Sequence, residues 1–422
     1  MVVLDYVLGV VLKVYQILLG LAALFSLKAA QLFKGQKGSI GLMREWRTQN
    51  PDAKVFWIHA ASLGEFEQGR PVIEEFKALY PTASVVLTFY SPSGYEVRKN
   101  YAGADLILYL PVDTTKAMSR FIKEMRPSMV VIVKYEVWPN MLRILNESEI
   151  PVVLFSAIFR PQHRFFSGLL KGYWSGVLQR IGDFHVQDEA SGRLLSGIGI
   201  DQWTVSGDTR YDRVWKVAQE AALKIEFVNW KGQSRVVVLG SSYEEEETLI
   251  QSLVLKYNDI KWVIAPHHIE EHRILSIEQR FLGETVRATE MFQKGEGLEK
   301  RVLILNTMGD LGGLYRLGEM AVVGGGWGKG IHNILEPSAH GCAVLWGPND
   351  GRFMEAKLMV EREGGVRVEG VEQAKRQLED WIEHAEKGEE VGKNARELVR
   401  RGAGATDKVL KTIVEKWEGK KR

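Results

Sequence analysis

The segment Ala321-Val-Val-Gly-Gly-Gly-Trp-Gly-Lys-Gly-Ile-His-Asn-Ile-Leu-Glu-Pro-Ser-Ala-His-Gly341 decides the fold prediction. An apolar strand over Ala321–Val323 runs into glycines, and a helix is expected to begin near His332 or Asn333. Glycines let the backbone approach a ligand closely, and a helix N-terminus directs unpaired N–H groups and positive dipole charge toward an anion. The segment therefore predicts an anion site at the edge of a parallel α/β sheet.

Asn333 and Glu336 are three residues apart, so both lie on one face near the predicted helix start. A carboxylate there can accept hydrogen bonds from a ribose diol, and an amide can donate or accept. The same pair also matches a capping box with Asn333 as N-cap, which would be purely structural. Neither the P-loop nor the dinucleotide fingerprint fits, because no Ser or Thr follows Gly-Lys and the G-x-G-x-x-G spacing is absent.

Length and composition set limits on the remaining possibilities. A chain of 422 residues with 45% hydrophobic content is long enough for two domains, each with its own core. Its 55 basic and 53 acidic residues nearly cancel, so no global field indicates a nucleic-acid partner. The single cysteine, Cys342, excludes an internal disulfide and is expected in the core. His267 and His268 are adjacent without an H-E-x-x-H spacing, so no metal site is expected.

The N-terminal stretch Tyr6–Leu27 is almost entirely apolar, and at about 1.5 Å per residue it is just long enough to cross a bilayer. Residues 1–30 are therefore predicted to be a membrane anchor helix. Lys13 near its middle is unfavourable inside a bilayer, so a helix lying in the membrane interface is the alternative. The basic residues that follow place the body of the protein on the cytoplasmic side by the positive-inside rule: Lys28, Lys34, Lys37, Arg44 and Arg47.

Beyond Asn50 apolar runs alternate with helical patterns, which is typical of parallel sheets covered by helices. We predict two Rossmann-like domains, residues 31–210 and 235–422, joined by a linker over 211–234 and facing a central cleft. Charged helices over 371–422 are expected to pack back across the surface. The predicted strands are Val55–Ala60, Ser84–Phe89, Leu106–Leu110, Met129–Val133, Pro151–Phe155, Asp183–Val186, Trp203–Val205, Arg235–Leu239, Trp262–Ala265, Val302–Leu305, Ala321–Val323 and Ala343–Trp346.

Two carboxylates follow strands of the first domain. Glu65, in Ser62-Leu-Gly-Glu65, is the candidate general base, because a base must lie within hydrogen-bond reach of the proton that it removes. Ser62 and Glu65 also match a capping box, so a structural role stays open. Glu136 comes directly after the apolar strand that ends at Val133, and either an ion pair or a substrate contact would explain it.

Basic side chains and loops complete the candidate set. Arg210 carries the forked, permanent charge that suits a phosphate or carboxylate, with an interdomain salt bridge as the alternative. Arg160 and Arg164 lie in a basic and aromatic stretch that we expect to receive lipid phosphates or a membrane surface. In the second domain, Pro266-His267 and Met308-Gly-Asp310 end strands beside the glycine-rich segment.

Taken together, these motifs resemble the Kdo transferases of lipopolysaccharide assembly, which transfer 3-deoxy-D-manno-octulosonic acid (Kdo) and have the two-domain GT-B glycosyltransferase fold. The resemblance covers nearly the whole chain, with the motifs in the same order. They are the N-terminal anchor, Ser62-Leu-Gly-Glu65, Glu136-Val-Trp-Pro-Asn140, Gly207-Asp-Thr-Arg-Tyr-Asp212, Pro266-His-His268, Met308-Gly-Asp310 and His332-Asn-Ile-Leu-Glu-Pro337.

The resemblance implies transfer of Kdo from CMP-Kdo to the lipid A precursor (lipid IVA), at the cytoplasmic face of the inner membrane, with no organic cofactor. By the same resemblance Glu65 deprotonates the acceptor hydroxyl for inverting displacement, while Glu136 and Arg210 stabilise the transition state. The implied CMP contacts are Pro266, His267, Met308, Gly309, Asp310, Asn333, Ile334, Leu335 and Glu336. The alternatives are a GT-B enzyme with a UDP-sugar donor and a non-catalytic nucleotide-binding membrane scaffold.

The sequence departs from the commoner family pattern at three positions. Arg210 stands where lysine is usual, which keeps the charge but changes its geometry. His267 replaces a usual arginine, so a donor contact there becomes dependent on pH. Asp310 replaces a usual glutamate and is one methylene shorter. None of these changes removes the predicted base.

Overall fold

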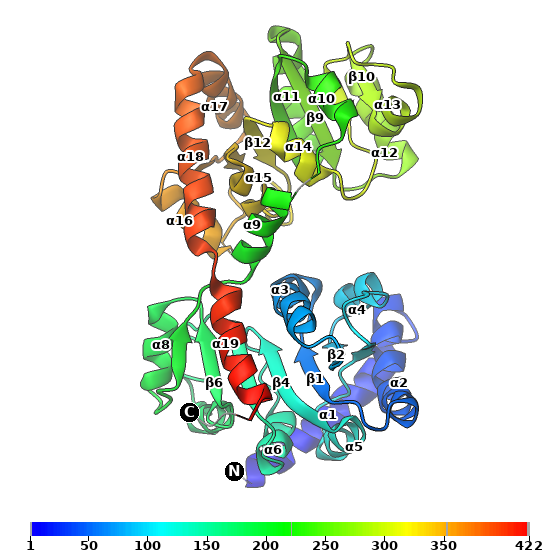
Figure 1. The fold of residues 1–422 in the computed structure, drawn as a ribbon, viewed down its shortest axis with the longest axis vertical. Coiled ribbons are helices and arrows are strands. Elements are labelled where there is room, and N and C mark those ends of the chain that lie inside the picture. The colour runs from blue at the N-terminus through cyan, green and yellow to red at the C-terminus, as the bar shows by residue number, and fades with distance from the viewer. Residues whose placement is uncertain (1, 221, 352, 420–422) are drawn as a thin grey trace. The chain divides into compact units, whose positions relative to one another are not determined.

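The computed structural model describes residues 2–220, 222–351 and 353–419 (Figure 1). The chain forms two compact units, one of Met1–Asp212 with Ala403–Arg422 and one of Arg213–Gly402. Each unit contains a seven-stranded sheet whose strand pairs are all parallel. The parallel α/β class predicted from the sequence is therefore confirmed.

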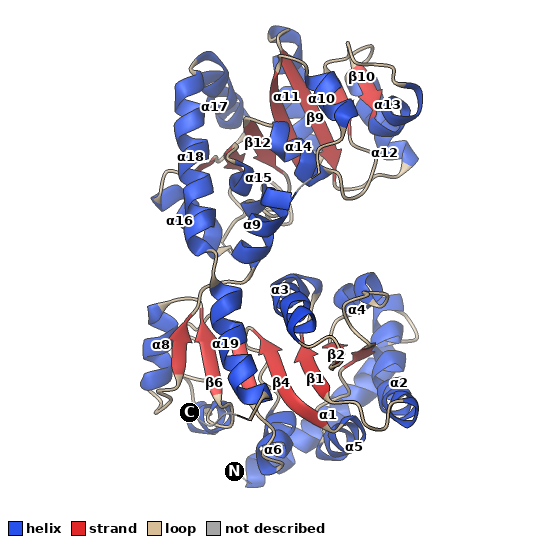
Figure 2. Ribbon diagram, in the orientation of Figure 1, coloured by secondary structure: helices blue, strands red, loops and turns tan. Residues whose placement is uncertain are grey.

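The sheet of the first unit has the strand order β3-β2-β1-β4-β5-β6-β7, so the first strand lies inside the sheet and the chain winds outward in both directions (Figure 2). Its strands are β1 (Val55–His59), β2 (Ser84–Phe89), β3 (Leu106–Tyr109), β4 (Pro127–Val133), β5 (Val152–Ala157), β6 (Asp183–Val186) and β7 (Trp203–Val205). Its helices are α1 (Val2–Ala22), α2 (Leu27–Gln49), α3 (Leu63–Leu79), α4 (Pro92–Arg98), α5 (Thr115–Met125), α6 (Pro139–Glu147), α7 (Lys171–Leu178), α8 (Glu189–Ser196) and α19 (Ala405–Trp417).

Both faces of this sheet are covered, which explains why its strands are continuous apolar runs rather than alternating ones. Successive side chains of β1 point to opposite faces: Trp57 packs into the core under α2, α5, α6 and α7, and Phe56 packs into the core under α3 and α19. The C-terminal helix contributes Trp417, whose ring lies 4.0 Å from the ammonium group of Lys54. The last helix thus completes the core of the first unit.

The sheet of the second unit has the order β10-β11-β9-β8-β12-β13-β14. Its strands are β8 (Arg235–Ser242), β9 (Ile260–Pro266), β10 (Thr285–Arg287), β11 (Val302–Ile304), β12 (Met320–Val323), β13 (Ala343–Trp346) and β14 (Gly365–Arg367). Its helices are α10 (Ile225–Lys231), α11 (Glu244–Lys256), α12 (Glu271–Arg280), α13 (Ala288–Lys294), α14 (Leu311–Leu317), α15 (Leu335–His340), α16 (Met354–Glu361), α17 (Val371–Glu383) and α18 (Ala385–Gly402), and α9 (Arg210–Glu220) begins at the boundary of the two units.

The register of β8 and β12 positions the glycine-rich segment. These central strands pair from Met320 opposite Val237 to Val323 opposite Gly240, so their carboxyl ends lie at the same edge. Buried apolar residues of β8, β9 and β12 pack against α11, α12 and α17 beneath that edge. A rigid core therefore supports the loops that follow these strands.

The structure differs from the sequence prediction at several places. All twelve predicted strands are present, but the sequence prediction missed β10 and β14, two three-residue strands at the edges of the second sheet. The sequence assigns residues 403–422 to the second domain, whereas this segment packs on the first unit. The segment 211–234, whose composition favours helix, contains most of α9 and all of α10. Cys342 is buried, as expected.

The N-terminal helix is shorter than predicted. The apolar stretch is interrupted by a turn at Ala23–Phe25, and Ser26 begins α2 as its N-cap. Among residues 2–220, 222–351 and 353–419, no helix combines the length and the hydropathy needed to cross a membrane.

Candidate active site

Glu65 lies where β1 passes into α3 in the first unit. Ser62 is the N-cap of α3, and its hydroxyl accepts a hydrogen bond from the Glu65 backbone N–H at 3.5 Å. The Glu65 carboxylate accepts from the Ala61 backbone N–H at 2.5 Å. The capping arrangement expected from the sequence is thus present, and it holds the carboxylate beside the end of β1.

The environment of Glu65 favours proton exchange. Its side chain is buried, with 8% exposed. Burial raises the pKa of Glu65, while the hydrogen bonds from Ala61 and Ser62 and the charge of Lys134 act in the opposite direction. A carboxylate with a raised pKa is a stronger base than an exposed one, so the structural and catalytic roles of Glu65 are compatible.

A sharp turn after β4 brings Glu136 close to Glu65. Lys134 adopts a left-handed backbone conformation, with φ of 62°, and its N–H donates to the Phe155 carbonyl oxygen at 2.8 Å. This conformation is unfavourable for a residue with a side chain, and such residues concentrate at functional sites. The turn redirects the chain, so that Glu136 reaches the pocket instead of continuing the strand.

Glu136 lines a pocket of about 610 Å³ within the first unit. Burial raises the pKa of Glu136 to about 7, with a further contribution from the charge of Glu65, against the influence of Arg164, Trp138 and Lys134. A pair of neighbouring carboxylates, one of which raises the proton affinity of the other, is a common acid-base arrangement. The pocket is lined by Leu8, Leu12, Asp113, Tyr135, Glu136, Val137, Trp138, Pro139, His163, Arg164, Phe165 and Trp174.

The basic and aromatic stretch predicted from the sequence contributes one wall of this pocket. The guanidinium of Arg164 lies 3.8 Å from the ring centroid of Trp174 and attracts the charge of Glu136. Arg160 is exposed, and its charge acts on Tyr135 and His163. The structure therefore places both arginines around the Glu136 pocket.

The sequence analysis did not identify two buried residues of this region, His59 and Asp113. Trp138 donates from Nε1 to Nε2 of the buried His59, so the proton of that imidazole lies on Nδ1, which contacts Thr88. Asp113, which is 1% exposed, accepts hydrogen bonds from the backbone N–H groups of Asn140 and Met141 and thereby caps α6. Neither residue stands in a recognisable local motif, because each partner is distant in sequence.

Arg210 forms an ion pair with Asp208 at 2.8 Å, and Gln68 of α3 donates to the same carboxylate at 2.9 Å. Burial acts to raise the pKa of Asp208, but Arg210 and the Gln68 amide hold it below its usual range. Gln68 and Glu65 are three residues apart on α3, so the helix that carries Glu65 is fixed to the Arg210 pair. Arg210 therefore has a structural partner within the first unit.

In the second unit, glycines of the opening segment allow backbone to pack against backbone. A Cβ at Gly324 would lie 2.1 Å from the Ser241 carbonyl oxygen, and one at Gly326 would lie 2.4 Å from the Gly347 nitrogen. The sequence predicts that these glycines admit a ligand, but at these two positions the protein's own chain is the close neighbour. Glu246 fixes the loop further, since it accepts from the Gly325 N–H at 2.9 Å.

Asn333 and Glu336 interact with each other at the start of α15. The Asn333 amide donates to Glu336 at 3.0 Å, and its oxygen accepts from the Leu335 N–H at 3.0 Å. The helix begins at Leu335, two to three residues later than predicted, and contains six residues. Part of the capping interpretation is thus correct, and the exposed amide–carboxylate pair remains beside the loop.

Histidine and tyrosine rings gather at the same edge of the second sheet. The ring centroids of His267 and His332 are 4.6 Å apart, and the Tyr243 hydroxyl lies 3.2 Å from Nε2 of His332. Burial and the charge of His267 lower the pKa of His332 to about 4, while burial is the main cause of the lowered pKa of His267. Both imidazole rings are therefore predominantly neutral at pH 7.

Two residues outside the predicted Met308–Asp310 motif, Thr307 and Lys224, hold this loop in place. Asp310 accepts from the Thr307 hydroxyl at 2.6 Å and forms an ion pair with Lys224 at 2.8 Å. Met308 is 83% exposed, and Gly309 has φ of 91°, which explains the glycine. Lys224 was missed because it lies 86 residues away in the sequence.

Comparison with known proteins supports the resemblance. The family model described as 3-Deoxy-D-manno-octulosonic-acid transferase (kdotransferase) matches residues 36–213, which include Glu65, Glu136 and Arg210. The chain is also 26% identical over 375 residues to the 3-deoxy-D-manno-octulosonic acid transferase of Haemophilus influenzae, covering 85% of this chain and 86% of the relative. The chain is therefore similar to the 3-deoxy-D-manno-octulosonic acid transferases.

Further relatives agree with this placement. The enzyme of the same name from Aquifex aeolicus is 26% identical over 316 residues, covering 74% of this chain and 80% of that one. Among solved structures, the UDP-GlcNAc 2-epimerase of Neisseria meningitidis covers 86% of this chain and 100% of its own, with a TM-score of 0.59 and 16% identity. That likeness concerns the fold, which has two parallel-sheet α/β domains of the GT-B-like type.

Proposed function

We propose that this protein is an inverting glycosyltransferase that transfers Kdo from CMP-Kdo to the lipid A precursor. The observation that carries the proposal is that the family match includes the two carboxylates whose proton affinities the first unit raises. Glu65 accepts the proton of the acceptor hydroxyl, whose oxygen attacks the anomeric carbon of Kdo. The bond from that carbon to the CMP phosphate oxygen breaks, and CMP leaves with the bonding electrons.

The remaining site residues receive roles consistent with their environments. Glu136, with a pKa of about 7, is available in its protonated form to donate a hydrogen bond to an anionic oxygen of the reactants. Arg164, beside Glu136, and the exposed Arg160 supply positive charge for acceptor phosphates. Arg210 contributes through its charge and by holding Asp208.

In the second unit, we assign CMP to the loops around the glycine-rich segment. The neutral His267 ring offers a flat face and a nitrogen for hydrogen bonding, and the Asn333–Glu336 pair offers oxygen acceptors for a ribose diol. Pro266, Ile334 and Leu335 shape the backbone of this edge, and Met308, Gly309 and Asp310 form its neighbouring loop. The tightly packed glycines hold these groups in position before the ligand arrives.

A membrane location is part of the proposal. Nine apolar side chains of α1 and the following turn are between 45% and 89% exposed and recur at helical spacing, so they form one stripe. A continuous exposed apolar stripe is typical of a helix that lies in a membrane interface. We propose the cytoplasmic face of the inner membrane, where CMP-Kdo and the lipid acceptor are both accessible. The stripe consists of Val7, Val10, Val11, Val14, Ile17, Leu18, Leu21, Leu24 and Phe25.

The test is incubation of the protein with CMP-Kdo and tetraacylated lipid A precursor, followed by mass spectrometry of the product. One or more Kdo additions are expected, and their number answers a question that the sequence leaves open. CMP should inhibit the reaction, whereas UDP should not. Inhibition by UDP alone would indicate a UDP-sugar donor, and CMP binding without any turnover would indicate a non-catalytic scaffold.

A further inference from the structure

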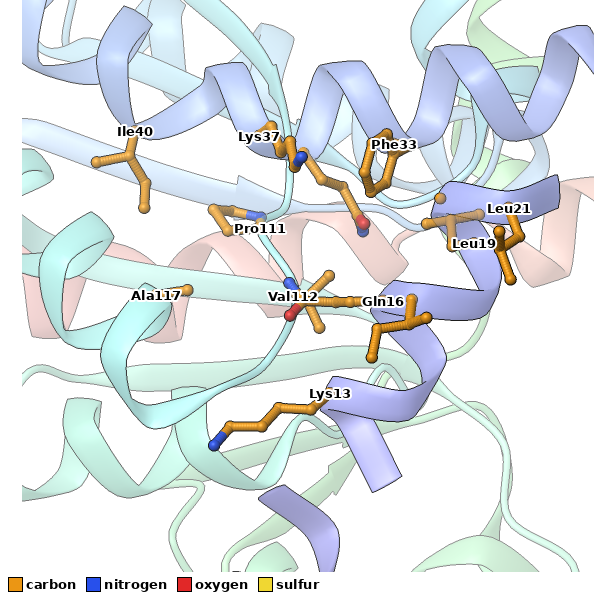
Figure 3. A pocket seen from close by; sticks show the side chains of 13 residues that line it. Lys13, Gln16, Leu19, Leu21, Phe33, Lys37, Ile40, Pro111, Val112 and Ala117 are labelled. Atoms are coloured by element: carbon orange, nitrogen blue, oxygen red, sulfur yellow. The ribbon is translucent and has the colours of Figure 1, made fainter. Parts of the chain in front are cut away.

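A second pocket, which shares no lining residue with the Glu136 pocket, lies between α1 and α2. Its volume is about 730 Å³, within the range of small-molecule sites. Figure 3 shows side chains of α1, α2 and the segment from Pro111 to Ala117 surrounding it. It is lined by Lys13, Gln16, Ile17, Leu19, Gly20, Leu21, Phe33, Gln36, Lys37, Ile40, Pro111, Val112 and Ala117.

The walls of this pocket combine an apolar interior with positive charge. Most lining side chains are aliphatic or aromatic, which suits a hydrocarbon chain. Lys13 and Lys37 are exposed, and the Lys37 ammonium lies 4.1 Å from the Phe33 ring centroid. An apolar cavity bordered by two ammonium groups is complementary to an amphiphile that carries an anionic group beside its chain.

A buried polar group on the wall is available to a ligand. Gln36 is 5% exposed, and its carboxamide lies near the Tyr90 hydroxyl, but neither amide atom makes a hydrogen bond of normal geometry. A buried amide without good partners is unfavourable, so a ligand with an ester, amide or hydroxyl group close to its chain would stabilise it.

The pocket lies next to two features of the proposed acceptor site. Ile17 and Leu21 belong both to its lining and to the exposed apolar stripe, so a chain could enter from a membrane that contacts the stripe. Leu8 and Leu12 of the same helix line the Glu136 pocket. Lys13, the residue after Leu12, lines the pocket between α1 and α2, so the two pockets are neighbours along this helix.

We infer that this pocket binds one acyl chain of the acylated acceptor, with Lys13 and Lys37 holding an adjacent phosphate. The inference rests on the proposed function for the identity of the acceptor. It assigns α1 a role in recognition in addition to its contact with the membrane.

The experiment measures binding of cis-parinaric acid, a fatty acid whose fluorescence increases in apolar surroundings, to the full chain. Saturable binding is expected, with displacement by the tetraacylated precursor and none by its fully deacylated form. Ala117→Trp fills the pocket and should weaken binding at least tenfold. Ser119→Trp, at an exposed position on the same helix outside the lining, is the matched control and should change affinity less than twofold.

A second pair of variants keeps the test decisive if Ala117→Trp fails to fold. Lys13→Glu with Lys37→Glu should weaken binding of the anionic probe and reduce its dependence on salt, whereas Lys34→Glu on the same helix α2 should not. Equal affinities in the lining and control variants would overturn the inference. If Ala117→Trp transfers Kdo with an unchanged KM for the acceptor, the acyl-chain inference is wrong and the proposed function stands. If the probe binds in the pocket but the native protein transfers no Kdo, the proposed function is wrong and the pocket still binds an acyl chain.

Discussion

The carboxylate pair of the first unit and the glycine-rich loop of the second unit are organised in opposite ways. Around Glu65 and Glu136, the fold buries groups that prefer water and thereby raises their proton affinity. Around Gly324 and Gly326, the fold packs backbone against backbone, and the Gly325 N–H between them donates a hydrogen bond to Glu246. The first arrangement supports chemistry and the second supports recognition.

The largest effect should come from Glu65→Gln, which removes the base and keeps the shape. We expect the rate constant for Kdo transfer to fall about 10²–10⁴-fold, the range typical of a general base. The measurement is turnover with CMP-Kdo and the lipid acceptor, accompanied by calorimetry of CMP binding. Glu74→Gln on the same helix, whose carboxylate pairs with Arg70, is the control and should retain activity. Full turnover in Glu65→Gln would remove Glu65 from the mechanism.

The second largest effect is expected from Gly324→Ala, which tests the close backbone packing of the glycine-rich loop. The new methyl group would lie 2.1 Å from the Ser241 carbonyl oxygen, so the backbone of one strand end must move. We expect a loss of about 3 kcal/mol in the free energy of unfolding, together with weaker CMP binding. Gly328→Ala is the matched control, because its nearest neighbour would be 3.9 Å away. Denaturant titration of both variants tests the difference, and equal stability would contradict the packing argument.

Arg210 tests whether a charged group serves structure, chemistry or both. Arg210→Ala leaves the buried Asp208 without its ion pair and should destabilise the protein by about 2 kcal/mol. Arg210→Lys retains the charge and should recover more than half of that stability. If Arg210→Lys is stable but its rate of transfer falls more than tenfold, the guanidinium also acts in the reaction. Unfolding curves and turnover rates of both variants separate the two contributions.

The smallest effect concerns the dependence of stability on pH. The pKa of Glu136 is raised from its ordinary value near 4.5 to about 7, so the folded state binds more protons than the unfolded state between these values. Stability contributed by this group is therefore lost as the pH rises through that window. Glu136→Gln should be more stable than the native protein at pH 8, and the difference should vanish below pH 4.5. Urea titrations at both pH values measure it, and a constant difference would mean that Glu136 is not perturbed.

Much of the fold follows from local sequence. The long apolar runs predict strands that are buried on both faces, and their alternation with helices predicts parallel sheets, so even short strands such as Trp203–Val205 were located correctly. The two missed strands, β10 and β14, lie at the edges of their sheet and have three residues each. Such short strands form because a neighbouring strand offers a partner, and that information is not local.

The N-terminal helix and the C-terminal helix show where local patterns mislead. The apolar stretch predicts one continuous helix as far as Leu27, but the turn at Ala23–Phe25 and the N-cap at Ser26 end α1 at Ala22 and begin α2. Residues 403–422 follow the second sheet in sequence, yet Trp417 packs with Phe56 and Phe76 of the first unit. Where a helix packs depends on which apolar surface remains uncovered, and this is decided by the assembled sheet.

The sequence by itself determined the fold class, the loops that carry the candidate site and the residue types available there. Hydrophobic periodicity, capping residues and the ends of strands are local properties, and local properties can be read from a chain without coordinates. Only the tertiary structure decided that the charge of Glu65 raises the pKa of Glu136, that Asp310 pairs with Lys224, and that the close approach of Ser241 requires a glycine at position 324. Burial and electrostatic coupling depend on distances between residues far apart in sequence, and these distances are set only when the sheets assemble.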